Sequence, residues 1–218
     1  MSEEGKGRAT GSASSDAEVQ TARSGSWAAE AAVVEALRRG DEEAFTRLVD
    51  QHHVSLRRIA RLYVSSPAVA DDVVQDTWLA VIQGVWAFEG RSSLKTWILR
   101  ILTNRAKTLA LREGRTVPFA EGDVGDPLVA VHSTPAGDSQ DPGPESILLT
   151  QEASVQVRAA IDALPANQRV VITMRDLEGC SSEEVCNVLG LSETNQRVIL
   201  HRARSAVRAT LTGYLRKE

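Results

Sequence analysis

Residues 176–208, DLEGCSSEEVCNVLGLSETNQRVILHRARSAVR, constrain the fold most, because they hold two helix starts separated by a tight turn. Ser181 and Glu184 have the S-x-x-E spacing of a capping box, which predicts a helix beginning after Ser181. Gly190 is suited to end that helix, and Ser192 is placed to cap a second one. A short helix, a glycine-containing turn and a capped second helix predict a helix-turn-helix.

The second helix of this motif is expected to have a basic face. Arg197, His201, Arg204 and Arg208 follow at i, i+4, i+7 and i+11, so they share one side of a helix. In DNA-binding helix-turn-helix proteins the second helix enters the major groove. The alternative is an ordinary helical hairpin whose basic face is only solvated.

The composition favours an all-α fold. Aromatic residues make up 4% of the chain, while Ala, Val, Leu and Arg are frequent, and no strand-like alternation stands out. The formal net charge of −4 argues against a uniformly basic nucleic-acid binder. The charge is unevenly distributed, however: residues 91–115 are mainly basic and residues 114–145 mainly acidic. Only the basic stretches can neutralise phosphates.

Changes in composition predict two small helical domains joined by a flexible linker. Residues 1–26 are rich in Gly, Ser, Ala and Glu without periodicity and are interpreted as a disordered tail. Residues 27–113 form the first predicted domain. Residues 114–144 contain five of the seven prolines and are expected to form an acidic linker, longer than most loops inside a compact domain. Residues 145–218 form the second predicted domain.

The helix predicted from Ser66-Pro67 to about Trp86 has two different faces. Small, β-branched and aromatic residues occupy one side, the expected core side, and Asp72, Gln75, Asp76, Leu79 and Gln83 occupy the other. A solvated polar face explains most of this second stripe. Leu79 in the middle of it is better explained by a protein partner.

A further helix is expected to restart after Gly90, with Ser92 or Ser93 as its cap. A capped helix start surrounded by cations suits contact with phosphate, and aromatic residues nearby can stack on unpaired bases. The alternative is that Trp86, Phe88 and Trp97 are core residues, which we favour for the two tryptophans.

Other functional classes find little support. Cys180 and Cys186 lack zinc-ligand spacing and are interpreted as reduced thiols, His52 and His53 are interpreted as structural, and no metal or cofactor is expected. No apolar run reaches the roughly 20 residues of a membrane helix, and no signal peptide is evident, so a cytoplasmic protein without membrane insertion is expected. No nucleophile motif or acid–base pair indicates an enzyme. Asp71, Asp72 and Asp76 could mimic a cluster of metal ligands, but Asp71 lies about 100° from Asp72 on a helix, which argues against a metal site.

The order of these motifs resembles the sigma-70 family of bacterial RNA polymerase initiation factors, and most closely its small extracytoplasmic-function (ECF) class. The resemblance rests on DDVVQDTW (71–78), FEGRSSLKTWILRI (88–101) and EGCSSEEVCNVLGLS with LHRAR near the C-terminus. It covers about residues 30–113 and 145–215. It implies a protein that binds core RNA polymerase, directs it to promoters through the −10 and −35 elements, and promotes DNA opening.

The resemblance also implies roles for individual residues. Contacts with the clamp of the largest polymerase subunit are implied for Asp72, Gln75, Asp76 and Leu79. Contacts with the −10 element are implied for Phe88, Arg91, Ser92, Ser93, Lys95, Thr96 and Asn104. Contacts with the −35 element are implied for Glu193, Thr194, Asn195, Arg197, Val198, His201 and Arg202. The polymerase flap and an anti-sigma factor are further implied partners, and the acidic linker would enter the polymerase channels.

The chain departs from the family's usual recognition helix at Asn195-Gln196-Arg197-Val198-Ile199. The missing base at Ile199 is expected to remove a phosphate contact. Gln196 replaces an apolar residue, and because Asn and Gln can read adenine edges, the promoter preference is expected to differ.

The main alternative function is a stand-alone helix-turn-helix regulator. Such a protein would need a dimer interface or a sensor domain, and residues 30–113 lack the glycine-rich phosphate loop and alternating strands of a receiver domain.

Overall fold

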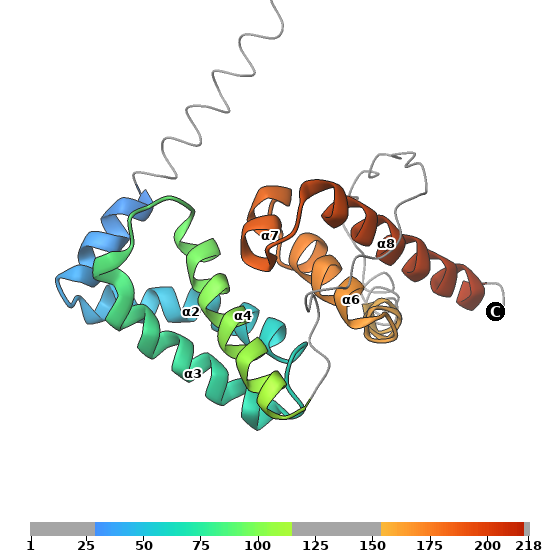
Figure 1. The fold of residues 1–218 in the computed structure, drawn as a ribbon, viewed down its shortest axis with the longest axis horizontal. Coiled ribbons are helices and arrows are strands. Elements are labelled where there is room, and N and C mark those ends of the chain that lie inside the picture. The colour runs from blue at the N-terminus through green and yellow to red at the C-terminus, as the bar shows by residue number, and fades with distance from the viewer. Residues whose placement is uncertain (1–28, 115–153, 216–218) are drawn as a thin grey trace, which may run out of the picture.

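A computed structural model describes residues 29–114 and 154–215. We call these ranges the N-terminal unit and the C-terminal unit. Within the described residues every regular element is helical, which confirms the all-α prediction (Figure 1). The tail, most of the predicted linker and the start of the predicted second domain lie outside the described residues.

The N-terminal unit is a bundle of four helices and one short 3-10 turn. It consists of a helix over residues 29–38, α2 (Glu42–Ala60), α3 (Pro67–Gly84), the 3-10 turn η1 (Val85–Ala87) and α4 (Leu94–Arg112). Helix α4 packs against both α2 and α3. The predicted helix starts at Ser66 and Ser93 are confirmed, since their side chains accept hydrogen bonds from the N–H groups of Val69 and Thr96. Asp41 caps α2 in the same way by accepting from the N–H of Ala44.

The core of this unit confirms the predicted inner face of α3. Val74 and Val81 are fully buried. Trp78 is also buried and meets Phe45 of α2 edge to face, with the ring centroids 5.8 Å apart. Burial of this apolar face holds α3 between its neighbours, so the opposite face of α3 is left at the surface.

The C-terminal unit comprises a helix over residues 154–162, α6 (Ala166–Ile172), the π-helical turn η2 (Thr173–Leu177), α7 (Ser182–Leu189) and α8 (Glu193–Leu215). Both halves of the predicted capping box are formed, since Ser181 and Glu184 bond each other's backbone N–H groups. Gly190 ends α7 with a left-handed φ of 72°, which an L side chain would resist. Helices α7 and α8 therefore form the predicted helix-turn-helix.

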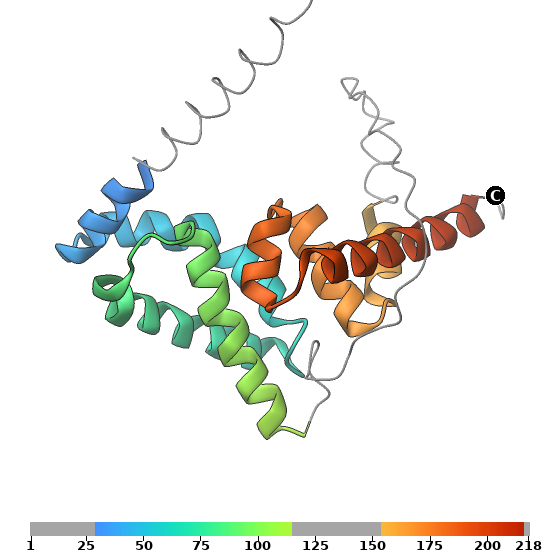
Figure 2. The same cartoon turned by 45° about the horizontal axis from the view of Figure 1, so that its top comes forward.

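The two units pack against each other, chiefly through α7 and α4 (Figures 1 and 2). Both views place α7 beside the N-terminal half of α4, while α8 extends away from the bundle. Most of α8 therefore makes no contact with the N-terminal unit.

Candidate polymerase and promoter interfaces

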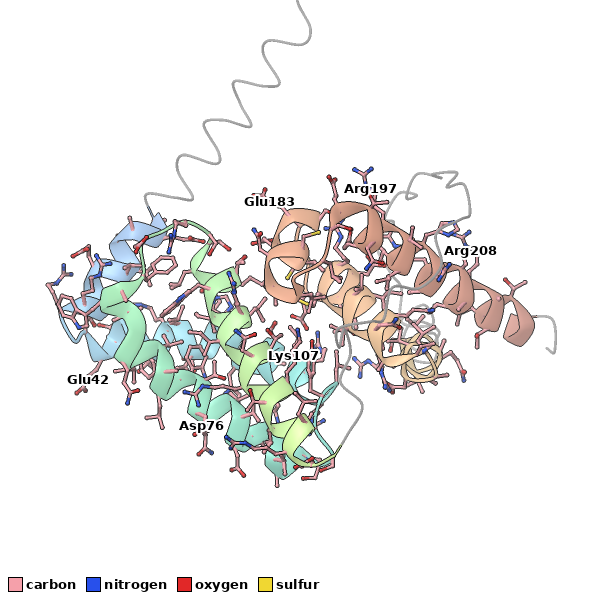
Figure 3. All side chains as sticks on the ribbon, viewed as in Figure 1. Glu42, Asp76, Lys107, Glu183, Arg197 and Arg208 are labelled. Carbon is pink, nitrogen blue, oxygen red and sulfur yellow. The ribbon has the colours of Figure 1, made fainter. Side chains whose placement is uncertain are left out.

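The outer face of α3 is exposed as predicted. Asp72, Gln75 and Asp76 are exposed, and Leu79 retains 57% of its surface. Figure 3 shows Asp76 pointing away from the bundle. Its carboxylate lies 3.4 Å from Arg105 of α4, a pair that stays in contact with water and contributes little to stability.

This face is larger and more apolar than the predicted stripe of Asp72, Gln75, Asp76, Leu79 and Gln83. Ile82 is 51% exposed and Trp86, which follows in η1, is 69% exposed. Together with Leu79 they occur at i, i+3 and i+7, which places them along one side. Our preference for Trp86 as a core residue is therefore wrong, because η1 turns its indole outward. The regular spacing from Leu79 was the signal that could have identified both residues.

The segment between η1 and α4 is held in place by helix 29–38. Arg38 donates from Nη2 to the carbonyl oxygen of Phe88 over 2.7 Å and from Nε to that of Val85 over 3.3 Å. Glu30 accepts from the N–H of Leu94 over 3.1 Å. These bonds fix both ends of the segment against a helix far away in sequence.

A cavity of about 330 Å³ lies beside this segment at the start of α4. Its lining combines cationic, hydroxyl and aromatic groups with one residue of α7, and comprises Ala87, Phe88, Glu89, Arg91, Ser92, Thr96, Trp97, Arg100 and Asn187. Phosphate oxygens and base edges can be bonded by such groups. The structure thus brings Phe88, Arg91, Ser92 and Thr96, all predicted to contact the −10 element, to one cavity.

Two predictions about this segment need correction. Phe88 is only 8% exposed and packs on Trp97, with ring centroids 5.1 Å apart, so it shapes the cavity wall and offers no open face for stacking. The N–H groups of Leu94 and Thr96 bond Glu30 and Ser93, so they are not free for phosphate. Phosphate contact would have to come from side chains.

The other side chains predicted to contact the −10 element lie near this cavity or along the same helix. Ser93 and Lys95 sit at the start of α4 and bond residues of the C-terminal unit. Asn104 is exposed and does not line the cavity. Arg100 does line it, and its spacing of four from both Thr96 and Asn104 puts the three on one side of α4. We did not assign Arg100 to the site from the sequence, although its spacing from Thr96 and Asn104 is regular.

The outer surface of α8 carries most of the residues predicted for the −35 element. Glu193, Thr194 and Arg197 are exposed, whereas Asn195, Val198, His201 and Arg202 are partly buried. Arg197 donates to Glu193 over 2.6 Å on the same helix. Figure 3 shows Arg197 and Arg208 on α8, with Arg197 pointing away from the N-terminal unit.

The inner surface of α8 corrects our interpretation of two residues. Gln196 is 1% exposed, and its side-chain amide oxygen Oε1 accepts from the Ser182 hydroxyl over 2.9 Å, so it cannot read a base edge in this structure. Ile199 is 6% exposed, so its side chain belongs to the core and a base there would not reach phosphate. The spacing of these residues with buried Leu200 and Ala203 indicated an inward stripe.

One arginine of the predicted basic face has a structural partner. Arg204 donates from Nε and Nη2 to the carboxylate of Asp176 over 2.9 and 2.6 Å, joining α8 to η2. The hydrogen bond with Asp176 raises the pKa of Arg204, against the opposing effect of burial. This ion pair reduces the positive charge that α8 can offer to DNA.

The part of the chain that the structure describes contains no group of three His, Cys, Asp or Glu side chains that could hold a metal ion. Asp71, which we considered as a metal ligand, bonds Arg57 of α2 over 3.0 Å. Among the described helices, none is long and apolar enough to cross a membrane.

Comparisons with known proteins identify the family. Residues 48–116 match the family model for sigma-70 region 2, and residues 154–207 match that for sigma-70 region 4. The ECF RNA polymerase sigma-E factors of Escherichia coli (strain K12) and Salmonella typhimurium (strain LT2) are each 31% identical over 176 residues, which is 80% of this chain and 90% of theirs.

Solved structures agree with these matches. The sigma factor RpoE of Bartonella quintana, solved with the anti-sigma factor NepR, is 26% identical with a TM-score of 0.53, over 77% of this chain and 96% of that one. CnrH, solved with the cytosolic domain of CnrY, has the same fold at 24% identity and a TM-score of 0.57, over 85% of this chain and 98% of that one. The chain belongs to the sigma-70 family of RNA polymerase sigma factors, in its ECF class.

Proposed function

We propose that this sigma factor binds core RNA polymerase through the outer face of α3 and reads promoter DNA with two surfaces. The main observation in support of this proposal is the exposed apolar stripe of Leu79, Ile82 and Trp86. Large apolar side chains gathered on a surface mark a protein interface. A stand-alone regulator would need a dimer or sensor contact, whereas a sigma factor needs this face for the polymerase.

The docking face consists of the apolar stripe and its acidic border, Asp72 and Asp76, with Gln75 between them. The apolar side chains supply affinity, and the carboxylates favour a basic partner surface. Contact with the polymerase flap is assigned to the C-terminal unit by family resemblance alone.

The cavity at the start of α4 is the proposed site for a −10 base. Extracting a base from the DNA stack costs a few kcal/mol, so a preformed, partly cationic pocket lowers the barrier to opening. Arg91 and Arg100 would contact the backbone there, and Ser92 and Thr96 would bond the base. Ser93, Lys95 and Asn104 complete the proposed surface, while Phe88 supports its wall.

The outer face of α8 is the proposed −35 reader. The residues that would enter the groove are Glu193, Thr194, Asn195, Arg197, Val198, His201 and Arg202, and Arg197 is placed to bond either a guanine edge or a phosphate. Asn195 keeps its proposed role, whereas burial prevents Gln196 from reading a base edge.

We further propose that the two units correspond to separate domains linked by an acidic segment, that the protein acts in the cytoplasm without catalysing a reaction, and that an anti-sigma factor regulates it. The complex of the Bartonella quintana relative with its anti-sigma factor supports this last point.

Run-off transcription with core polymerase from the same bacterium on a genomic library, followed by sequencing of start sites, tests the proposal. Defined start sites that depend on this protein are expected. A gel shift without polymerase separates the alternative, because a stand-alone regulator would bind its operator tightly alone. No transcription from any genomic promoter would contradict the sigma factor assignment.

A further inference from the structure

The C-terminal unit bonds the residues that we assign to −10 DNA. Glu184, the capping-box residue of α7, accepts through Oε1 from the hydroxyls of Ser93 over 2.9 Å and Thr96 over 3.0 Å. Its Oε2 accepts from the N–H of Ser181 over 2.8 Å. One carboxylate thus caps its own helix and also holds the first turn of α4.

The pKa of Glu184 agrees with this bonding. Burial alone would raise it, but the Ser181 N–H, the two hydroxyls and the charge of Lys95 hold the pKa below its ordinary value. Glu184 therefore faces α4 as an anion surrounded by donors.

A second carboxylate, that of Glu178 between η2 and α7, holds α2 in the same way. Glu178 accepts from Arg58 over 2.6 Å and from the hydroxyl of Ser55, and its side chain is only 7% exposed. Its backbone carbonyl accepts from Lys95 Nζ over 2.7 Å. An ion pair with one partner so deeply buried is screened less than an ordinary surface pair.

These bonds occupy Ser93, Lys95 and Thr96, which all belong to the proposed −10 surface, and Asn187 of α7 forms part of the cavity wall. Glu184 engages the hydroxyls of Ser93 and Thr96, and the Glu178 carbonyl engages the ammonium group of Lys95. A DNA strand at the −10 surface would need the same donors. The C-terminal unit and a DNA strand cannot use the same donors at once.

We propose that the free protein is held in a closed state in which the Glu184 carboxylate and the Glu178 backbone carbonyl occupy the donors of the −10 surface in place of DNA. The Glu178 carboxylate anchors α2 in the same state, and the −10 surface becomes available only when the C-terminal unit moves away. This regulation rests on the proposed function of the cavity. The closed state itself does not, because it can be measured without DNA.

Spin labels on either side of the cavity measure closure directly. Ala87→Cys and Asn187→Cys place one label on each unit, in the full chain with Cys180→Ala and Cys186→Ala. Neither labelled position takes part in the Glu178 or Glu184 bonds. Pulsed electron paramagnetic resonance should give one short and narrow distribution of distances between the two labels when no further substitution is made. A long or broad distribution would overturn the proposal.

The charge variants then test the cause. Glu178→Gln with Glu184→Gln keeps side-chain shape and a capping acceptor but removes both anions, and should raise the population at long distances by about tenfold. Glu42→Gln with Glu183→Gln, two exposed carboxylates labelled in Figure 3, is the matched control and should change nothing. Equal distributions for both pairs would overturn the role of the two anions.

Thr96→Val tests the contact from the other unit, because it removes one donor to Glu184 at nearly constant volume. It should open the protein to a smaller extent, and no opening would overturn the Glu184 contact. Run-off transcription by the unlabelled protein is scored separately. Promoter-specific transcription by a protein that is open when free would contradict the closed state and leave the sigma function supported. A protein that is closed when free but directs no transcription would support the closed state and contradict the sigma function.

Discussion

The two surfaces that we propose contact DNA differ in accessibility. At the start of α4, Ser93, Lys95 and Thr96 are already bonded to the C-terminal unit. On α8, Glu193, Thr194 and Arg197 are exposed. The docking face on α3 is exposed too. One conformation therefore leaves the proposed polymerase site and the proposed −35 surface exposed while it engages part of the proposed −10 surface. We infer that polymerase docking comes first and separation of the two units second.

The largest expected effect distinguishes binding of core polymerase by α3 from separation of the two units. Leu79→Arg puts a charge into the apolar stripe and should weaken core polymerase binding by about 2–4 kcal/mol, the range of an interface hot spot. The spin-label distance of the free protein should not change, because Leu79 makes no part of the contact between the units. Binding is measured by titration of labelled core enzyme.

Leu111→Arg is the matched control for this change, since Leu111 is 63% exposed at the far end of α4. It should bind core polymerase normally. Equal weakening by both substitutions would mean that the α3 face has no special role.

Asp76→Arg is expected to have a smaller effect on the same face, about 1–2 kcal/mol, through charge reversal against a basic partner. Stability should change little, because the Asp76–Arg105 pair is exposed. A pull-down with core polymerase and a thermal melt measure the two quantities. Unchanged capture would count against the acidic border of the docking face.

The exposed −35 surface of α8 is tested by Arg197→Ala, which should weaken binding of the holoenzyme to promoter DNA by about 1–3 kcal/mol. If Arg197 contacts a phosphate, the substitution should also lower the salt slope, the slope of log affinity against log salt concentration, by about one. Arg204→Ala is the matched control. Arg204 is already paired with Asp176, so its loss should lower the melting temperature and leave the salt slope almost unchanged. The opposite pattern would reverse our assignment of the two arginines.

The smallest expected effect concerns pH and Glu184. Because its folded-state pKa is lowered, its contribution to the free energy of unfolding is complete above the ordinary glutamate pKa and is lost as pH falls through the lowered value. Partial contact with water keeps this contribution below about 1 kcal/mol. Denaturant unfolding of the wild type and Glu184→Gln should therefore differ most near neutral pH and converge in acid. A difference that did not vary with pH would show that the carboxylate charge contributes nothing.

Local features of the sequence predicted much of this architecture. Ser66, Ser93 and the Ser181–Glu184 pair define helix starts through hydrogen bonds between near neighbours, and such bonds need no tertiary information. The two faces of α3 follow equally well from periodicity. The inward stripe of α8 was also encoded by spacing, but comparison with the family's usual recognition helix led us to interpret Gln196 as able to read a base and Ile199 as a lost phosphate contact.

Other features depend on contacts that leave no periodic signal. The π turn at Thr173–Leu177 follows α6 directly, and its residue types give no sign of the change from α-helical geometry. The bonds of Glu178 and Glu184 with α2 and α4 join parts of the chain that lie far apart in sequence, and such a distant polar pair cannot be inferred from one sequence.

A reversible lock between the units tests the central claim most directly. Cysteines at Ala87 and Asn187, in the background without the two native cysteines, can be joined across the cavity by a disulfide-containing bismaleimide, and run-off transcription with core polymerase is then measured before and after reduction. We predict that the locked protein binds core polymerase but does not transcribe, and that reduction restores transcription to the level of the uncrosslinked double-cysteine protein. Full transcription by the locked protein would contradict the closed state as a barrier to promoter opening.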